Sequence, residues 1–251
     1  MSKKRHAGRA AADFRPIEVV SGFHTMSEGS VLYRAGGTVV LVTASLEDGV
    51  PKWIAEKDVG WLTAEYQMHP RSNPKRREER EGRNKPPKGR TLEIQRLVGR
   101  ALRSALDLKA LGPRTLTIDC DVLEADGGTR TASVTAGFIA TALALHSRGL
   151  ARVIRDQVAA ISVGLVDGEV LVDLDYSEDS RARVDLNVVG TLDGHLIEVQ
   201  GTAEGQAVPR AEFDRMLDAA LAAIQSLVEV QKTALERAGA DLRILMKKRE
   251  G

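Results

Sequence analysis

Hydrophobic residues in the first half of the chain follow two different periods. Stretches with apolar residues at alternate positions, typical of half-buried strands, are residues 27–47, 59–68 and 114–123. A Gly-Gly pair at 36–37 interrupts the first stretch and predicts a β-hairpin. Apolar residues between Ile94 and Ala105 recur at helical spacing before a stop at Gly112, and residues 131–149 predict a second, mostly buried helix.

The second half repeats this scheme of strands followed by a helix. Its strand-like stretches are residues 158–176, 182–190 and 195–202, with turns at Asp167-Gly168 and Asp193-Gly194. A long amphipathic helix, with apolar residues from Phe213 to Val228 on one face, closes the fold. We therefore predict an α+β fold of two β-α-type halves with a mixed β-sheet packed by helices. The predicted units are an N-terminal subdomain 1–150, a C-terminal subdomain 151–238 and a flexible tail 239–251.

The composition is that of an ordinary globular protein, with 43% hydrophobic and 28% charged residues and a net charge of +1. No apolar run approaches the roughly 20 residues that span a bilayer, and the basic start of the chain lacks the apolar stretch of a signal peptide. Cys120 is the only cysteine and lies in an alternating strand pattern, which predicts a core thiol in a reducing compartment. We expect a cytoplasmic protein with no membrane partner.

Residues 71–90 form a strongly basic segment. They carry nine positive and three negative charges, a local net charge of +6, and no apolar residue other than proline, which predicts a mobile surface loop. The segment leads into a helix on which Arg96, Arg100 and Arg103 share the face opposite the apolar stripe. Both features are compatible with a merely solvated surface, and both suit the binding of phosphates.

Two helix starts combine glycine with arginine. In "ADGGTRTASVTAGF", residues 125–138, the glycines let a ligand come close to backbone N–H groups, and Arg130 stands where the helix begins. This arrangement is expected of an anion site, although a tight strand-to-helix connection explains the stretch equally well. Arg90 follows Gly89 at the start of the helix after the basic segment and offers the same chemistry.

Asp179 and Asp185 stand six residues apart around a turn that enters a strand. Two carboxylates that converge at a strand end suit Mg²⁺, which binds partly through water, although acid-rich turns are common without a metal. The five histidines show no paired spacing of metal ligands, and no serine lies in a nucleophile-elbow motif. We therefore expect neither a transition-metal site nor a serine hydrolase.

Four motifs, in this order and over nearly the whole chain, resemble the ribonuclease PH family of phosphorolytic exoribonucleases. They are "GRTLEIQRLVGRALRSALDL", "DCDVLEADGGTRTASVTAGF", "DYSEDSRARVDLNVV" and "EVQGTAEG". The opening "RHAGR…RP" and the segment "GWLTAEYQMHPRS" fit the family as well. The clearest difference is the long, highly charged filling of the basic segment, which leaves open how that segment contacts RNA.

The resemblance implies a ribosomal protein S5 domain 2-like fold and a homo-hexameric ring, built as a trimer of dimers. It implies a tRNA nucleotidyltransferase that uses inorganic phosphate as co-substrate to cleave the 3′-terminal phosphodiester of RNA. The products are nucleoside 5′-diphosphates, and the reverse reaction adds nucleotides. The expected substrates are the 3′ ends of tRNA precursors, structured RNA with a single-stranded tail, and ribosomal RNA.

Carried onto this chain, the resemblance assigns a role to each of the charged motifs. Phosphate binding falls to Arg90, Gly128, Thr129 and Arg130, and the catalytic positions linked to Mg²⁺ are Asp179 and Asp185. The candidate RNA contacts are Arg76, Arg77, Arg80, Arg83, Arg96 and Arg100.

Three alternatives stay open. Asp185 acts either as a metal ligand or as a general acid. The chain could instead be a non-catalytic RNA-binding ring subunit of an exosome-like assembly, but such a subunit would lose the acidic pair or the phosphate arginine. A hydrolytic nuclease would need a denser carboxylate cluster for two metals.

Overall fold

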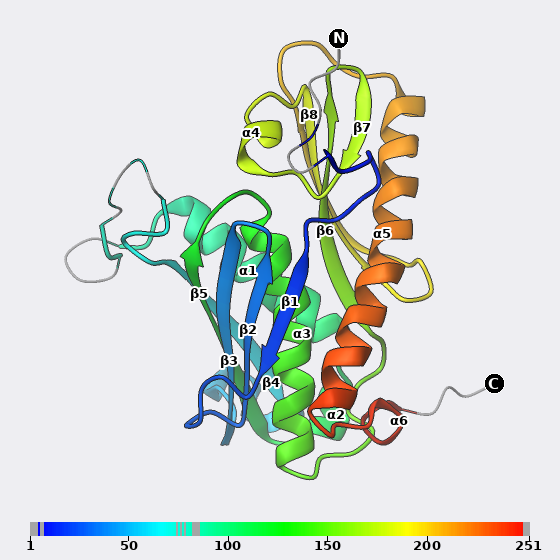
Figure 1. Ribbon diagram of the computed structural model, residues 1–251. Coiled ribbons are helices and arrows are strands. Elements are labelled where there is room, and N and C mark those ends of the chain that lie inside the picture. The colour runs from blue at the N-terminus through cyan, green and yellow to red at the C-terminus, as the bar shows by residue number, and fades with distance from the viewer. Residues whose placement is uncertain are drawn as a thin grey trace.

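The computed structural model describes residues 5, 8–73, 75, 77, 79–81 and 86–247. Two β-sheets form this part of the chain, with helices between and around them (Figure 1). The first sheet has the strand order β1-β2-β3-β5-β4, with β1 Ile17–Ser21, β2 Gly29–Ala35, β3 Thr38–Asp48, β5 Arg114–Glu124 and β4 Trp61–Met68. Neighbouring strands are antiparallel except β4 and β5, which are parallel because a helical crossover joins them. The predicted hairpin is the β2–β3 turn, where Gly36 has a φ of +55°.

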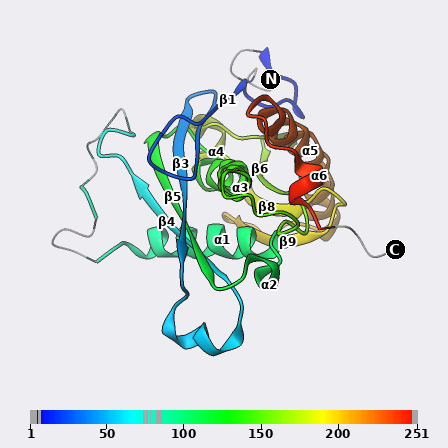
Figure 2. The same ribbon diagram turned by 90° about the horizontal axis from the view of Figure 1, so that it is seen from below.

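Helices cover the first sheet on the side that faces the second half. They are α1 Gly89–Ser104, α2 Leu108–Leu111 and α3 Thr129–Ser147. Every residue of α3 from Thr129 to Leu145 is buried except Arg130, so the helix is enclosed on all sides, and its many small side chains let neighbouring elements approach closely. Seen from below, α3 lies at the centre of the molecule, with the first sheet on one side and the second half on the other (Figure 2).

The second sheet is wholly antiparallel and has the order β7-β6-β8-β9. Its strands are β7 Glu169–Val172, β6 Val158–Val166, β8 Val184–Thr191 and β9 Leu196–Ala203. The short helix α4 Tyr176–Asp179 precedes β8, and the long helix α5 Arg210–Arg237 runs along both halves (Figure 1). Only the first sheet is mixed, so the predicted mixed sheet corresponds to one half of the molecule.

Residues 239–247 are packed against the protein, so the expectation of a flexible tail from residue 239 was wrong for this segment. Helix α6 Leu242–Leu245 follows α5, and Ala240 and Leu245 are buried. Met246 pairs with Ile154 in a parallel bridge, and Lys247 Nζ lies 2.9 Å from the carboxylate of Asp107. Burial of the apolar residues stabilises the packed position of the segment, although its end is charged. Residues 248–251 lie outside the described residues.

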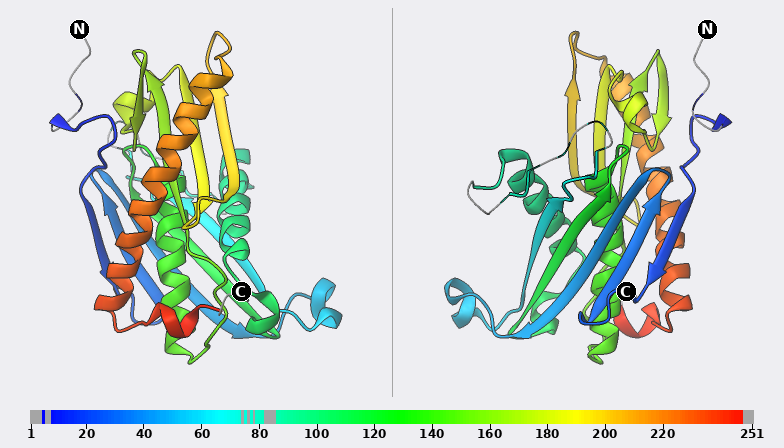
Figure 3. Two further views of the ribbon diagram at one scale, coloured as in Figure 1. Left: turned by 90° about the vertical axis from the view of Figure 1, so that its right-hand side faces the viewer. Right: turned by 60° about the vertical axis from the view of Figure 1, so that its left-hand side comes forward.

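One short element extends away from the sheets. The 3₁₀ helix η2, Lys52–Lys57, joins β3 to β4 and projects from the end of the first sheet that is remote from the second sheet (Figure 3). Among the described helices, none combines the length and the apolar character required to cross a membrane.

Candidate active site

The turn between β5 and α3, residues 126–128, is held in a conformation that requires glycine. Gly127 and Gly128 have φ values of +80° and +65°, in the left-handed region that favours glycine. A Cβ atom on Gly127 would lie 2.6 Å from the carbonyl oxygen of Leu174, so there is also no room for a side chain. Among the described residues no side chain caps α3, so its first amides remain available to an anion. This turn is the segment for which the sequence predicts an anion site, and it is called the phosphate turn below after that predicted role.

Two arginines stand at the starts of two helices that meet at this turn. Arg90 lies in the first turn of α1, which also begins without a side-chain cap among the described residues. Arg130 lies in the first turn of α3 and is half-buried. Its Nη1 donates hydrogen bonds to Gln200 on β9, at 3.0 Å, and to Glu93 on α1, at 3.3 Å. Both arginines line the same cavity.

The predicted acidic pair comes from α4 and β8. Asp179 is the last residue of α4, and Asp185 is the second residue of β8. Asn187 follows two residues later on the same face of β8, and its Nδ2 lies 3.3 Å from Asp185 Oδ2. The amide therefore adds a polar group that orients the Asp185 carboxylate.

The two arginines influence the ionisation of the acidic pair. Burial, followed by the charge of Asp179, raises the pKa of Asp185, while Arg130, Asn187 and Arg90 act in the opposite direction. Burial also raises the pKa of Asp179 against the effects of Arg90 and Arg130. Asp179 keeps an exposed surface, whereas Asp185 is half-buried. Two carboxylates that disfavour ionisation together suit a site that receives a cation.

A cavity of about 450 Å³ brings the predicted groups together, a size in the range of small-molecule sites. Its charged and glycine-rich lining includes Arg90, Gly127, Gly128, Thr129, Arg130, Asp179, Asp185 and Asn187. A second hollow of about 710 Å³ shares Arg90, Arg130, Asp179, Asp185 and Asn187 and continues along β9. The two spaces form one cleft between the halves of the molecule.

The donor set of the cleft fits Mg²⁺. Asp179 and Asp185 supply two carboxylates that line both spaces of the cleft, and water would complete the coordination. A bound cation would offset the burial and the repulsion from Asp179 that raise the pKa of Asp185.

The predicted RNA contacts divide into three groups. Arg77, Arg80 and Arg96 are exposed, whereas Arg76 and Arg83 lie outside the described residues. Arg100 has a protein partner: its Nη2 and Nε lie 2.6 and 3.1 Å from the two carboxylate oxygens of Glu198 on β9. The basic face of α1 is thus not uniformly free for RNA.

Several cleft residues were missed by sequence reasoning. Asn187 could have been found, because a strand places it on the same face as Asp185. Tyr176, which is 53% exposed, lines the cavity, and Gln200 on β9 accepts a hydrogen bond from Arg130. No local pattern indicated either of these two, since both reach the cleft only through the packing of the two halves.

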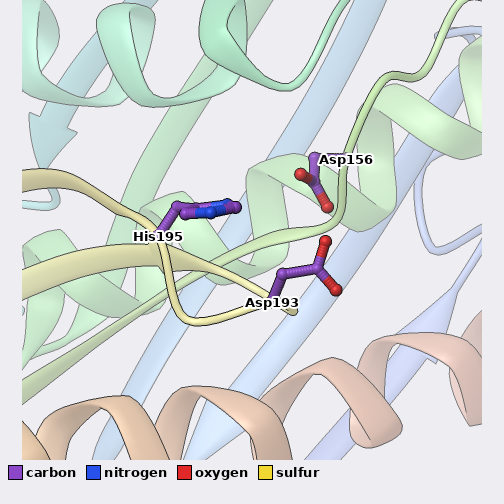
Figure 4. A group of neighbouring side chains, drawn as sticks. All are labelled: Asp156, Asp193 and His195. Carbon is purple, nitrogen blue, oxygen red and sulfur yellow. The ribbon is translucent and has the colours of Figure 1, made fainter. Parts of the chain in front are cut away.

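A further group of potential metal ligands lies outside the cleft. Asp156, Asp193 and His195 place one ligand atom each within 4.8 Å of one another (Figure 4). They come from the segment before β6 and from the β8–β9 turn, and none of them lines the cavities of the cleft. The group is therefore no part of the candidate site. The histidines show no paired ligand spacing in the sequence, and the expectation of no transition-metal site stays a prediction.

Both halves of the chain match known sequence families. Residues 13–147 match domain 1 of the 3′ exoribonuclease family and residues 156–223 match domain 2. The chain belongs to the 3′ exoribonuclease family. Ribonuclease PH of Mycolicibacterium gilvum is 51% identical over 93% of this chain and 92% of its own length. Ribonuclease PH of Nocardia farcinica is 50% identical over 92% of both chains.

Solved structures share the fold. The Archaeoglobus fulgidus exosome with RNA bound to the active site aligns with a TM-score of 0.75 and 25% identity, over 90% of this chain and 92% of that chain. Rice (Oryza sativa) Rrp46 aligns with a TM-score of 0.75 and 18% identity, over 92% of this chain and all of that chain. The predicted family, α+β fold and exoribonuclease activity are thus confirmed, whereas the individual site residues stay predictions.

Proposed function

We propose that the cleft catalyses phosphorolysis of RNA from its 3′ end, with inorganic phosphate as the attacking group and a nucleoside 5′-diphosphate as the product. The observation that carries the proposal is the meeting of two helix-start arginines, the phosphate turn and an acidic pair around one cavity. The family of the chain and its relatives named ribonuclease PH support the same reaction.

The residues of the cleft have separate tasks in this reaction. Arg90, Arg130 and the amides at the start of α3 bind phosphate and orient it in line with the leaving 3′ oxygen. Phosphate near neutral pH is already an anionic nucleophile, so the cleft needs no strong general base. Asp179 and Asp185 would hold Mg²⁺, which, when bound, neutralises charge that develops on the leaving oxygen.

The substrate that we propose is an RNA with a single-stranded 3′ end, above all a tRNA precursor, and ribosomal RNA in addition. The exposed basic residues Arg77 and Arg80 lie on the segment that leads to Arg90, so they are placed to bind the backbone of an incoming strand. We also propose a homo-hexameric ring in the cytoplasm, as the family resemblance implies, and the assembly proposal is supported by the fold shared with the Archaeoglobus fulgidus exosome structure.

One incubation tests the reaction. The purified protein is mixed with a 3′-extended RNA and Mg²⁺, with and without inorganic phosphate, and the released nucleotides are identified by chromatography. We expect nucleoside 5′-diphosphates whose release depends on added phosphate. Monophosphates released without phosphate would indicate a hydrolytic nuclease. Tight RNA binding without any release would indicate a non-catalytic ring subunit of an exosome-like assembly.

A further inference from the structure

The three arginines of the opening motif, Arg5, Arg9 and Arg15, reach the acidic segment that precedes β8. Arg5 binds Glu178 through Nε, at 2.8 Å, and through Nη2, at 3.0 Å. Arg9 Nη2 lies 3.2 Å from the same carboxylate. Arg15 Nη2 lies 2.7 Å from Asp173 Oδ1. All of these side chains are at most 7% exposed, so the motif forms a buried cluster of charges.

Arg15 also extends from this cluster to the phosphate turn. Its Nε and backbone N–H donate to Asp173 Oδ2, at 2.9 and 2.8 Å. From the same guanidinium, Nη1 donates to the carbonyl oxygen of Asp126, and Nη2 lies 3.4 Å from that of Gly127. One side chain thus joins the carboxylate of Asp173 to two consecutive carbonyl groups of the turn that leads into α3.

Asp173 has an unusual backbone conformation that fits this task. Its φ of +55° lies in the left-handed region, which is unfavourable for a residue with a side chain. Such conformations persist where surrounding interactions fix them, and they are concentrated near functional sites. Here the hydrogen bonds from Arg15 fix the carboxylate, and Asp173 N donates to Ser162 O at 2.8 Å.

The other end of the acidic segment is fixed to the same turn. Asp175 and Glu178 form a capping box around α4, whose last residue is Asp179. The backbone N–H of Tyr176 lies 3.3 Å from Asp126 Oδ1. Asp126 therefore contacts Arg15 through its carbonyl group and α4 through its carboxylate.

We propose that Arg15 and Asp173 are positioning residues, which set the separation between the phosphate turn and the helix that carries Asp179. The inference rests on the proposed phosphorolysis. Neither residue of the pair lines the two cavities of the cleft. The pair instead determines the position of the turn relative to α4. Displacements of a fraction of an ångström matter for in-line attack. A change in the pair should therefore impair the use of phosphate by more than its effect on folding explains. Changing one partner of a buried ion pair leaves the other charge unpaired and lowers stability, so folding is measured beside the kinetics.

The test compares two variants of the pair with a matched control. Arg15→Lys keeps the charge but loses the planar fork that reaches Asp173 and the two carbonyl groups together. Asp173→Asn keeps the shape but removes the charge. The control is Gln231→Met, because Gln231 is fully buried and its Nε2 donates two hydrogen bonds, to Thr135 O at 3.1 Å and Val158 O at 2.8 Å, away from the cleft.

For each protein we would measure phosphorolysis against phosphate concentration, RNA affinity and thermal unfolding. Both variants of the pair should raise the phosphate KM at least about tenfold and lower kcat, with RNA affinity unchanged within about twofold. The control should lose stability without a change in phosphate KM. Arg15→Lys should be impaired less than Arg15→Gln, since the lysine retains one of the contacts.

Two results would overturn the proposal. Variants of the pair that lose stability and keep the wild-type phosphate KM would make the pair a structural element only. Failure of both Arg15→Lys and Asp173→Asn to fold would have the same meaning. If the wild type itself released nucleotides without using phosphate, the proposed function would fail instead, independently of the variants.

Discussion

At the scale of single residues, the cleft sets two carboxylates against two arginines within one cavity. The arginines lower the pKa values of Asp179 and Asp185, yet burial outweighs them and both pKa values are raised. The protein thus keeps two carboxyl groups at positions where their ionisation lowers the stability of the folded state. Such a cost is typical of residues retained for catalysis rather than for stability.

The variant Asp185→Asn separates the effect of this carboxylate on catalysis from its effect on stability. Turnover should fall by at least about a hundredfold, because the charge needed at the leaving group is lost, whereas RNA binding should remain. A raised folded pKa stabilises the protein below the ordinary aspartate value, and that contribution is lost as the pH rises through the folded pKa. The variant should therefore be at least as stable as the wild type at neutral pH, with a smaller difference near pH 4. Urea unfolding at both pH values and turnover at limiting Mg²⁺ check this, and near-normal activity would remove Asp185 from the catalytic set.

Arg90 tests the phosphate site. Arg90→Lys retains a positive charge but loses the fork that donates two parallel hydrogen bonds, so the phosphate KM should rise and kcat should fall, with Arg90→Ala worse. Polymerisation from nucleoside diphosphate should be impaired in parallel, since the same site releases phosphate. Arg96→Ala, on the same helix but outside the cavities, is the control and should change RNA affinity at most. If Arg90→Ala kept a normal phosphate dependence and bound RNA weakly, Arg90 would instead be a contact to the RNA backbone.

At the scale of elements, local patterns could predict what local sequence determines. The glycine pair before α3 could be predicted because glycine is the residue that adopts positive φ values, and the strand that contains Asp185 could be predicted from alternation. The contact of Gly127 with Leu174 was not, because it depends on two turns that come together from separate halves. The packing of Leu245 escaped prediction for the same reason, since its partners are distant in sequence.

The basic segment before α1 should bind RNA and not phosphate. Replacing Arg76, Arg77, Arg80 and Arg83 by glutamine should weaken RNA binding, and each lost contact should flatten the salt dependence of affinity by a slope of about 0.7. Phosphate KM should stay unchanged, because Arg90 and the phosphate turn are intact. Fluorescence titrations of a single-stranded RNA at several salt concentrations provide the measurement. An unchanged slope would show that the segment is a solvated insertion.

The C-terminal segment should contribute a pH-dependent part of the stability. Asp107 is buried, and the hydrogen bond from Lys247 lowers its pKa to about 2 against the opposing effect of burial. The contribution is complete above the ordinary aspartate value and is lost as the pH falls from about 4 to about 2. Asp107→Asn can still cap α2, so it should lower the free energy of unfolding by about 1 to 2 kcal/mol at neutral pH. Urea unfolding at pH 7 would contradict this if the two proteins were equally stable.

At the scale of the whole molecule, the cleft exists because the two sheets face each other across α3. The sequence indicated two halves and their elements, but it contained no signal for the distance between them. That distance depends on contacts far apart in the chain, such as Arg15 with Asp173 and Arg100 with Glu198. Contacts between residues so far apart in the chain arise only in the packed fold. The periodicity of a single sequence does not indicate them.

Arg100 shows how the whole fold can change the role expected of one residue. It was predicted as an RNA contact, but it joins α1 to β9 through Glu198, whose Oε1 also accepts a hydrogen bond from Gln200 at 2.9 Å. Gln200 in turn accepts from Arg130, so the link ends at a residue of the candidate phosphate site. Because Arg100 is already paired with a carboxylate, it should contribute little to the binding of RNA.

We therefore expect Arg100→Gln to leave the salt dependence of RNA affinity unchanged, in contrast to the variants of the basic segment. The pair is partly exposed, so the free energy of unfolding should fall by at most about 1 kcal/mol. Glu198→Gln should cause a similar loss, and the double variant should lose less than the two single losses together, since they remove the same interaction. Urea unfolding of the four proteins measures this coupling, and RNA titrations over a range of salt measure the slope. A slope flattened by about 0.7 in Arg100→Gln would instead mean that Arg100 leaves Glu198 when RNA binds and contacts a phosphate of the strand.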